Sequence, residues 1–319
     1  MIGVTRVDGI VEPIVKPIPA RLHVLLAREA SVGLVIRHGT AKSVCTLLWN
    51  RKTDKFTLGQ WMRGRIDTES CDLSPNGGHF LYTAAKYALF KPSKYVDPVG
   101  QSVAWTVVSR SPYLKAVAYY PQRRAGGWFL NQHEYCVPGG NSTPDDRESP
   151  EVRRVVADLP VPSLYGARLL RGGWGMEDLR AQFARRIDYV KPAGAGWELR
   201  HRLQKGYRLS QGQIEADTSG WEWADIDGER LVWATNGCLW AGHMRRDGIH
   251  RLKLLHDFNG MSFERLAAPY EGGRPVPQEP VTKPTLPAAT SPPIWKRPHA
   301  PLRRKPNRTK IRPDAETND

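Results

Sequence analysis

Short apolar runs separated by turn residues dominate the chain between Arg21 and Ala268. The runs are four to eight residues long and rich in β-branched or aromatic side chains, which is typical of strands. They include residues 23–27, 33–37, 44–49, 103–108 and 114–120. Two intervening turns contain Asn76-Gly77 and Asp227-Gly228, steps that favour hairpins because both central residues can adopt positive φ. The pattern predicts a mainly β body.

One segment has a different period. Its apolar residues recur at three- and four-residue steps, as on one face of a helix. They are Met176, Leu179, Phe183, Ile187 and Val190. We expect a single helix near 176–190, with a strand as the alternative. The polar stretch from Pro138 to Pro150 predicts a long loop near 138–160, or a linker between two halves of the body.

An internal repeat accompanies the hairpins. A Gly-Trp pair followed by an apolar residue occurs four times, with its tryptophan at Trp128, Trp174, Trp197 and Trp221. The tryptophans are 46, 23 and 24 residues apart. A unit of about 46 residues made of two hairpins has the size of a four-stranded propeller blade.

Residues 71–82, CDLSPNGGHFLY, resemble the turn and strand of WD-repeat-like β-propellers. The body from about 21 to 270 is also similar to a group of uncharacterised bacterial proteins, which brings no known activity. The resemblance supports a small β-propeller-like array. Dividing the roughly 250 residues of the body by a unit of about 46 predicts about five blades over 21–270, preceded by an N-terminal extension at 1–20.

The charge is divided between this body and a tail. The chain has 47 basic and 32 acidic residues, a net charge of +15. Residues 271–319 contain ten basic and five acidic residues, a net +5, so the other 270 residues have a net charge of +10. The tail holds 11 of the 26 prolines and few apolar residues, so we expect it to be disordered.

Eight tail cations within 18 residues could make weak, salt-sensitive contacts with nucleic acid. We favour a solubilising tail without a partner, with binding to nucleic acid as the alternative. The candidate nucleic-acid-binding residues are Lys296, Arg297, Arg303, Arg304, Lys305, Arg308, Lys310 and Arg312.

Candidate chemistry is sparse. The densest acidic cluster consists of Glu215, Asp217, Glu222, Asp225, Asp227 and Glu229. It could hold a metal or supply acid/base catalysis, but we favour an exposed hairpin with Glu222 facing away from Trp221 and Trp223. Ser74 beside Asp72 is interpreted as a turn residue that bonds the backbone, and His133 with Cys136 as a weak candidate for a thiol–imidazole pair.

No linear catalytic, metal or cofactor motif is present. The nine histidines lack metal-ligand spacing. Cys45, Cys71, Cys136 and Cys238 form no CxxC pair, so we expect buried thiols in a reducing compartment. No apolar stretch is long enough to span a membrane, and the N-terminus does not read as a signal peptide. We therefore expect a cytoplasmic protein that does not enter a membrane.

Eleven tryptophans allow two interpretations. They could fill the core between neighbouring hairpin units, or they could combine with arginines into a groove that stacks bases. The second interpretation rests on Arg123-Arg124 before Trp128 and on Arg171 before Trp174. We favour the core role.

These features favour a non-enzymatic binding or scaffold protein with an unidentified protein partner and no cofactor. The alternative is a nucleic-acid-associated protein that uses the arginine-rich tail and the basic body. A second alternative is a hydrolase whose site is assembled from scattered loops at the propeller mouth.

Overall fold

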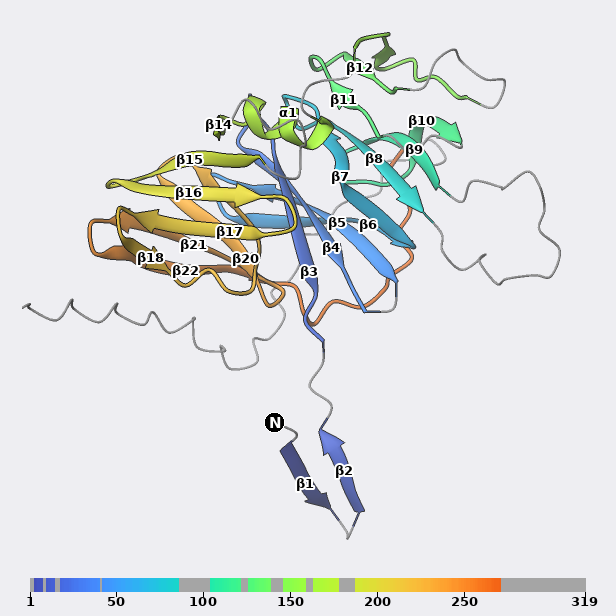
Figure 1. Cartoon of the computed structure of the whole chain (residues 1–319). Coiled ribbons are helices and arrows are strands. Elements are labelled where there is room, and N and C mark those ends of the chain that lie inside the picture. The colour runs from blue at the N-terminus through green and yellow to red at the C-terminus, as the bar shows by residue number, and fades with distance from the viewer. Residues whose placement is uncertain are drawn as a thin grey trace, which may run out of the picture.

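The computed structural model describes residues 3–7, 10–14, 18–40, 42–85, 104–121, 126–138, 146–158, 163–177 and 187–270 (Figure 1). The eight tail cations and Arg123-Arg124 lie outside these ranges, so the predictions that rest on them remain predictions. Within the described residues, no helix is long and apolar enough to cross a membrane.

The fold is mainly β and contains five sheets after a short N-terminal hairpin of β1 (Gly3–Val7) and β2 (Ile10–Ile14). Each sheet is formed by strands that follow one another in the chain, and all pairs are antiparallel except β12 with β13. The first sheet consists of β3 (Arg21–Leu26), β4 (Val32–His38), β5 (Ser43–Asn50) and β6 (Lys55–Arg63). The second consists of β7 (Arg65–Leu73), β8 (His79–Ala85), β9 (Ala104–Arg110) and β10 (Ala116–Pro121).

The later sheets differ in size. The third sheet consists of β11 (Trp128–Phe129), β12 (Glu134–Cys136) and β13 (Arg153–Arg154). The fourth consists of β14 (Gly175–Glu177), β15 (Asp188–Gly194), β16 (Trp197–Arg202), β17 (Gly206–Gln211) and β18 (Ile214–Ala216). The fifth consists of β19 (Trp221–Asp227), β20 (Arg230–Thr235), β21 (Cys238–Arg245) and β22 (Gly248–Asp257). The sequence thus correctly predicted strands and hairpins, including the turns at Asn76-Gly77 and Asp227-Gly228.

Neighbouring sheets share hydrophobic cores. One core joins the first and second sheets, one the second and third, and one the fourth and fifth. A further core joins the fifth sheet to the first and contains Trp223, Val232 and Trp49. The last sheet in the sequence therefore packs against the first.

Alternation along single strands produces this arrangement. On β8, Phe80 and Tyr82 pack toward the first sheet, whereas Leu81 between them packs toward the third. On β20, Trp233 packs toward the fourth sheet and Val232 toward the first. Because successive side chains of a strand point to opposite faces, an uninterrupted apolar run serves two cores at once.

The tryptophans have the predicted core role. Trp49 and Trp233 are fully buried, and Trp233 stacks on Trp221 with ring centroids 5.2 Å apart. Seven others are also buried or nearly so: Trp61, Trp128, Trp174, Trp197, Trp221, Trp223 and Trp240.

The helix prediction was wrong at both described ends of the segment 176–190. Met176 lies in β14 and Val190 in β15, and Gly175 pairs with Val190 in an antiparallel ladder. Residues 178–186 lie outside the described part of the chain. The observed helix, α1, spans Leu164–Arg171, where the sequence predicted none, and Ser163 caps it by accepting a hydrogen bond from Gly166 N.

The polar stretch predicted as a loop is partly structured. Arg153 and Arg154 form β13, and Arg147 forms a bridge with Tyr119. Residues 139–145 lie outside the described ranges.

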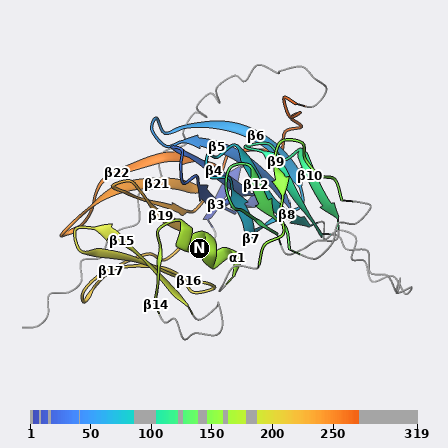
Figure 2. The same cartoon turned by 90° about the horizontal axis from the view of Figure 1, so that it is seen from above.

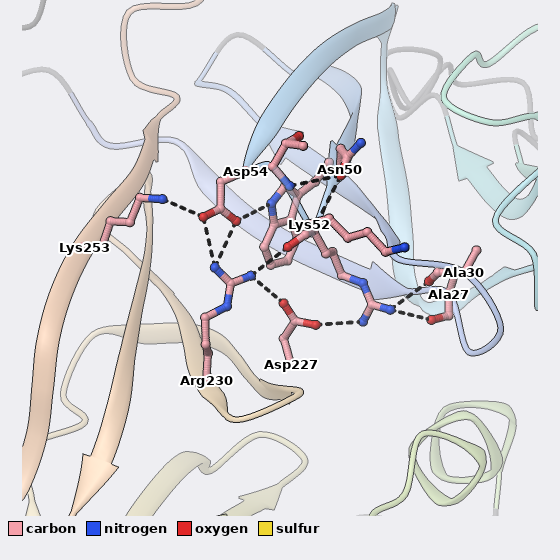
Figure 3. Close-up of polar contacts among 11 residues, drawn as sticks. Ala27, Ala30, Asn50, Lys52, Asp54, Asp227, Arg230 and Lys253 are labelled. Atoms are coloured by element: carbon pink, nitrogen blue, oxygen red, sulfur yellow. Dashed lines mark hydrogen bonds and ion pairs between the residues drawn. The ribbon is translucent and has the colours of Figure 1, made fainter.

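A charged network reinforces the contact between the fifth and first sheets (Figure 3). The Arg230 guanidinium contacts Asp54 at 3.0 Å and Asp227 at 2.7 Å. Lys253 Nζ lies 2.7 Å from Asp54, and Arg51 lies 3.1 Å from Asp227. Since both carboxylates are almost enclosed, with side chains 10% and 11% exposed, their pairing is stronger than that of ordinary surface ion pairs.

The chain after β22 contacts the first sheet and then the region beside the second. Phe258 O accepts a hydrogen bond from Arg37 of the first sheet, and Leu266 O accepts one from Gln60. Tyr270 then donates to Lys115 O beside the second sheet. The segment from Phe258 to Tyr270 thus links the first two sheets to the end of the fifth.

Candidate functional site

The first strands of three sheets meet near the middle of the body. β3 contacts both β7 and β19, and Leu22 N donates to Glu222 Oε2 at 2.7 Å. α1 lies beside them, between the second and fourth sheets (Figures 1 and 2). A pocket of about 380 Å³ is enclosed by β3, β7, α1 and β19, with Lys191 and Tyr207 added from the fourth sheet. We call it the central pocket.

Seven charged side chains line the central pocket. Two carboxylates line it, those of Asp72 and Asp225. The cations that line it are Arg28, Arg51, Arg168, Arg171 and Lys191. The arrangement has the chemistry of an anion-binding site, because cations exceed carboxylates in a concave space.

Asp72 fixes the position of Arg171 and of the third sheet. Its Oδ2 accepts a hydrogen bond from Phe129 N at 2.8 Å and lies 3.1 Å from Arg171. The same arginine donates to Phe129 O at 2.6 Å. Both charges of this pair are therefore used to hold α1, β7 and β11 together.

Asp225 forms the second internal pair. Lys191 Nζ donates to Asp225 Oδ1 and to Gly172 O, both at 2.7 Å. Burial raises the pKa of Asp225, and the nearby Lys191 charge partly opposes that rise. Lys191 thereby ties β15 both to β19 and to the end of α1.

Arg168 connects α1 to β7 and β3. Its Nη1 donates to Thr68 O at 3.0 Å and Cys71 O at 2.5 Å, and its Nη2 lies 3.2 Å from His23 Nε2. Burial and the Arg168 charge hold the pKa of His23 well below its ordinary value, so this imidazole is neutral and accepts the hydrogen bond.

A second cavity of about 510 Å³ lies beyond His23, which lines both spaces. Its wall includes Arg21, His38, Asp67 and Glu222. Burial lowers the pKa of His38 to about 4. The Arg168–His23 contact therefore lies near the boundary between the central pocket, where cations outnumber carboxylates, and the second cavity, where they do not.

The acidic cluster differs from its prediction. Asp225 and Asp227 form ion pairs instead of lying on a solvated face, and Glu222 accepts from Leu22 N. The cause is a bulge in β19: Trp221 pairs with Thr235 and Trp223 with Ala234, so Glu222 is an extra residue. Trp221 and Trp223 consequently enter different cores rather than sharing one face.

The remaining members of the cluster are Glu215, Asp217 and Glu229, which are exposed. In the described part of the chain, no group of three or more His, Cys, Asp or Glu side chains is placed to hold a metal ion.

Ser74 behaves as the predicted turn residue. Its hydroxyl donates to Asn76 Oδ1 at 2.8 Å and accepts from His79 N at 2.9 Å. Cys136 is buried and donates to Ala157 O, and burial raises the pKa of its thiol. This environment favours the neutral thiol over the thiolate that a pair with His133 requires.

The other cysteines are also buried, as predicted. Burial raises the pKa of Cys45 and Cys238 to about 12, and raises that of Cys71 as well. His201 is enclosed too: it contacts Tyr165 OH at 2.9 Å, and burial lowers its pKa to about 4. These groups are structural parts of the sheets and of their contact with α1.

The proposed base-stacking groove has no exposed rings where the structure describes it. Trp128 is 7% exposed and Trp174 is 3% exposed. Arg171 is engaged by Phe129 O and Asp72. Neither ring presents a free face on which a base could stack.

Sequence reasoning missed the cations that approach one another here. Arg28 follows β3, Arg168 lies on α1 and Lys191 lies on β15, so no linear motif contains them. The only local sequence feature that marks α1 is Ser163, a residue type that favours the N-cap position before Leu164. Comparison of the chain with protein-family models and with curated proteins found no match.

Proposed function

We propose that the chain is a binding protein built on a β-propeller-like body, which receives its partner at the central pocket. The observation that carries this proposal is the packing of the fifth sheet on the first, together with the cores shared by the first and second, the second and third, and the fourth and fifth sheets. Sheets related in this way resemble blades, and propellers commonly bind ligands where their first strands converge. The turn at 74–78 supports a relation to WD-repeat-like propellers.

The chemistry of the pocket supports binding rather than covalent catalysis. Asp72 and Asp225 are both held in ion pairs, so neither is an unengaged general base. The described thiols have raised pKa values and are poor nucleophiles. A hydrolase remains the weaker proposal because it would need a nucleophile or base outside these groups.

The proposal is tested by capturing partners from the organism of origin with full-length protein and two charge reversals. Arg28→Glu changes an exposed residue of the central pocket, and Arg246→Glu changes an exposed residue of the β21–β22 turn. We expect Arg28→Glu to reduce the recovery of specific partners at least tenfold and Arg246→Glu to leave it unchanged. Equal recovery with all three proteins would contradict binding at the central pocket.

A second candidate is nucleic-acid association. It is supported by the eight cations between Lys296 and Arg312, together with the excess of cations in the central pocket. Filter binding of mixed nucleic acid at increasing salt, with the full chain and with all eight cations changed to Gln, tests it. We expect the Gln variant to bind more weakly with a shallower salt dependence. The absence of salt-dependent binding in both proteins would rule the candidate out.

A further inference from the structure

Two of the five pocket cations form no ion pair with a carboxylate of the described residues. Arg51 is paired with Asp227, Arg171 with Asp72, and Lys191 with Asp225. The remaining two, Arg28 and Arg168, contact no carboxylate within the ranges that the structure describes. The central pocket therefore has a surplus of two positive charges after every internal pair is counted.

Arg168 is the more enclosed of the two. Its guanidinium is half-buried, and its acceptors are two backbone carbonyl groups and one neutral imidazole. A guanidinium offers five N–H donors, and these contacts use three of them. A partly desolvated cation that lacks an anion is destabilising, so an added anion in this pocket gains an unusually strong interaction.

Arg28 supplies a second cation at the mouth. It follows the end of β3, is exposed, and forms no side-chain hydrogen bond or ion pair with a described residue. Partial burial and the charge of Arg171 lower the pKa of Arg28, the nearby charges of Asp72 and Glu29 partly oppose this, and the guanidinium remains protonated. The positive field of the pocket therefore extends to a side chain that is free to rearrange around a ligand.

The size of the pocket limits the ligand. A volume of about 380 Å³ lies at the lower end of the range for small-molecule sites, roughly 300–1,000 Å³. Leu169 and Ile226 line the same space, are only partly buried, and can pack against an apolar part of a ligand. A small molecule fits this description better than the backbone of a long polyanion.

We propose that the central pocket binds a small oxyanionic ligand, with a phosphate or carboxylate group placed between Arg28 and Arg168. The guanidinium fork of arginine matches either group with two parallel hydrogen bonds. This inference deepens the proposed function and rests on its choice of the central pocket.

Isothermal titration calorimetry of the full-length protein in low-salt chloride buffer tests the inference. The probes are inorganic phosphate, pyrophosphate and succinate, so that separate arms distinguish phosphoryl from carboxylate ligands. We expect saturable binding of at least one probe at a single site. Absence of saturable binding with all three probes overturns the inference.

Variants locate that site. We expect Arg28→Ala to weaken the Kd at least tenfold, Arg28→Lys to weaken it less, and Arg246→Ala to leave it unchanged. Arg168→Met removes the inner charge while keeping a long side chain and should also weaken the Kd at least tenfold. If Arg168→Met does not fold, the Kd values of Arg28→Ala and Arg28→Lys still show whether the probe binds at the central pocket. Equal affinity in the Arg28→Ala and wild-type proteins overturns the assignment.

The two proposals fail in different ways. Loss of partner capture in Arg28→Glu without saturable binding of any probe would retain the proposed function and overturn the oxyanion site. Saturable binding of a probe that depends on Arg28, with partner capture unchanged in Arg28→Glu, would retain the oxyanion site and overturn the proposed function.

Discussion

The junction between the fifth and first sheets and the region around α1 are built in opposite ways. The junction has a shared apolar core with Trp49, Trp223 and Phe258, and its ion pairs lie beside that core. Around α1, no hydrophobic core cluster of the described residues joins the third sheet to the fourth. Long cationic side chains connect the elements there instead.

This difference shows where a binding pocket can form in such a body. Side chains that interdigitate in a core leave little space, because protein interiors are close-packed. Arg168 and Arg171 reach from α1 to carbonyl groups of β7 and to Phe129 O, and they leave a cavity beside them. The junction between the fifth and first sheets should therefore stabilise the fold, and the region around α1 should provide the binding pocket.

Replacing a tryptophan in the core between the fifth and first sheets should have the largest effect on stability. Trp49 is fully buried and stacks against Phe56 at 6.0 Å. We expect Trp49→Ala to lower the free energy of unfolding by about 3–5 kcal/mol, as for other large core truncations. Chemical denaturation measures this value. A loss of less than about 1 kcal/mol would mean that the junction contributes little to stability.

Removing a carboxylate from the charged network should come next. Asp227→Ala leaves Arg51 and Arg230 without one of their anions in a partly enclosed site. We expect a loss of about 2 kcal/mol, between the values for exposed and fully buried pairs. The matched control is Asp247→Ala, since Asp247 pairs with His250 on the exposed surface. If both variants lose the same stability, the network has no special role.

Protonation of Asp54 at low pH should weaken the junction between the fifth and first sheets. Burial alone would raise the pKa of Asp54, but hydrogen bonds from Lys253 and Arg230 outweigh it and hold the pKa below the ordinary 3.8. A depressed pKa adds stability above the unfolded value, and this stability is lost as the pH falls through the folded value. We therefore expect Asp54→Asn to reduce the difference in unfolding free energy between pH 7 and pH 3. An unchanged difference would contradict this role.

Weakening α1 should have the smallest and most local effect. Ser163 Oγ accepts from Gly166 N at 3.0 Å, and loss of such a cap costs about 1 kcal/mol. We expect Ser163→Ala to accelerate amide hydrogen exchange in Leu164–Arg171 and to leave exchange in β5 and β20 unchanged. Equally faster amide exchange in α1, β5 and β20 would show that α1 unfolds together with the sheets and not locally.

The strands could be predicted because their apolar runs are interrupted by clear turn residues. Phe80, Leu81 and Tyr82 read as one strand, and their two-sided burial explains the lack of polar alternation. The helical spacing of Met176 and Val190 was misleading, since these residues belong to two paired strands. α1 escaped prediction because its eight residues are too few to display a convincing period.

The pocket could not be predicted, since it depends on distant residues that the fold brings together. Arg168 lies 145 residues from His23, and Arg171 lies 99 residues from Asp72. The bulge at Glu222 also changed which side chains of β19 face the cavities, and nothing in the local sequence marks it. Linear motifs report local geometry, whereas this site is a product of sheet packing.

The contact between the first and last sheets is the central claim, and a double-mutant cycle between Asp54 and Arg230 tests it most directly. These residues are 176 positions apart in the chain, and Arg230 Nη1 lies 3.0 Å from Asp54 Oδ2. Denaturation of Asp54→Ala, Arg230→Ala and the double variant gives their coupling energy. We expect a coupling of about 1 kcal/mol or more, whereas additivity within about 0.3 kcal/mol would contradict a stabilising contact between the first and fifth sheets.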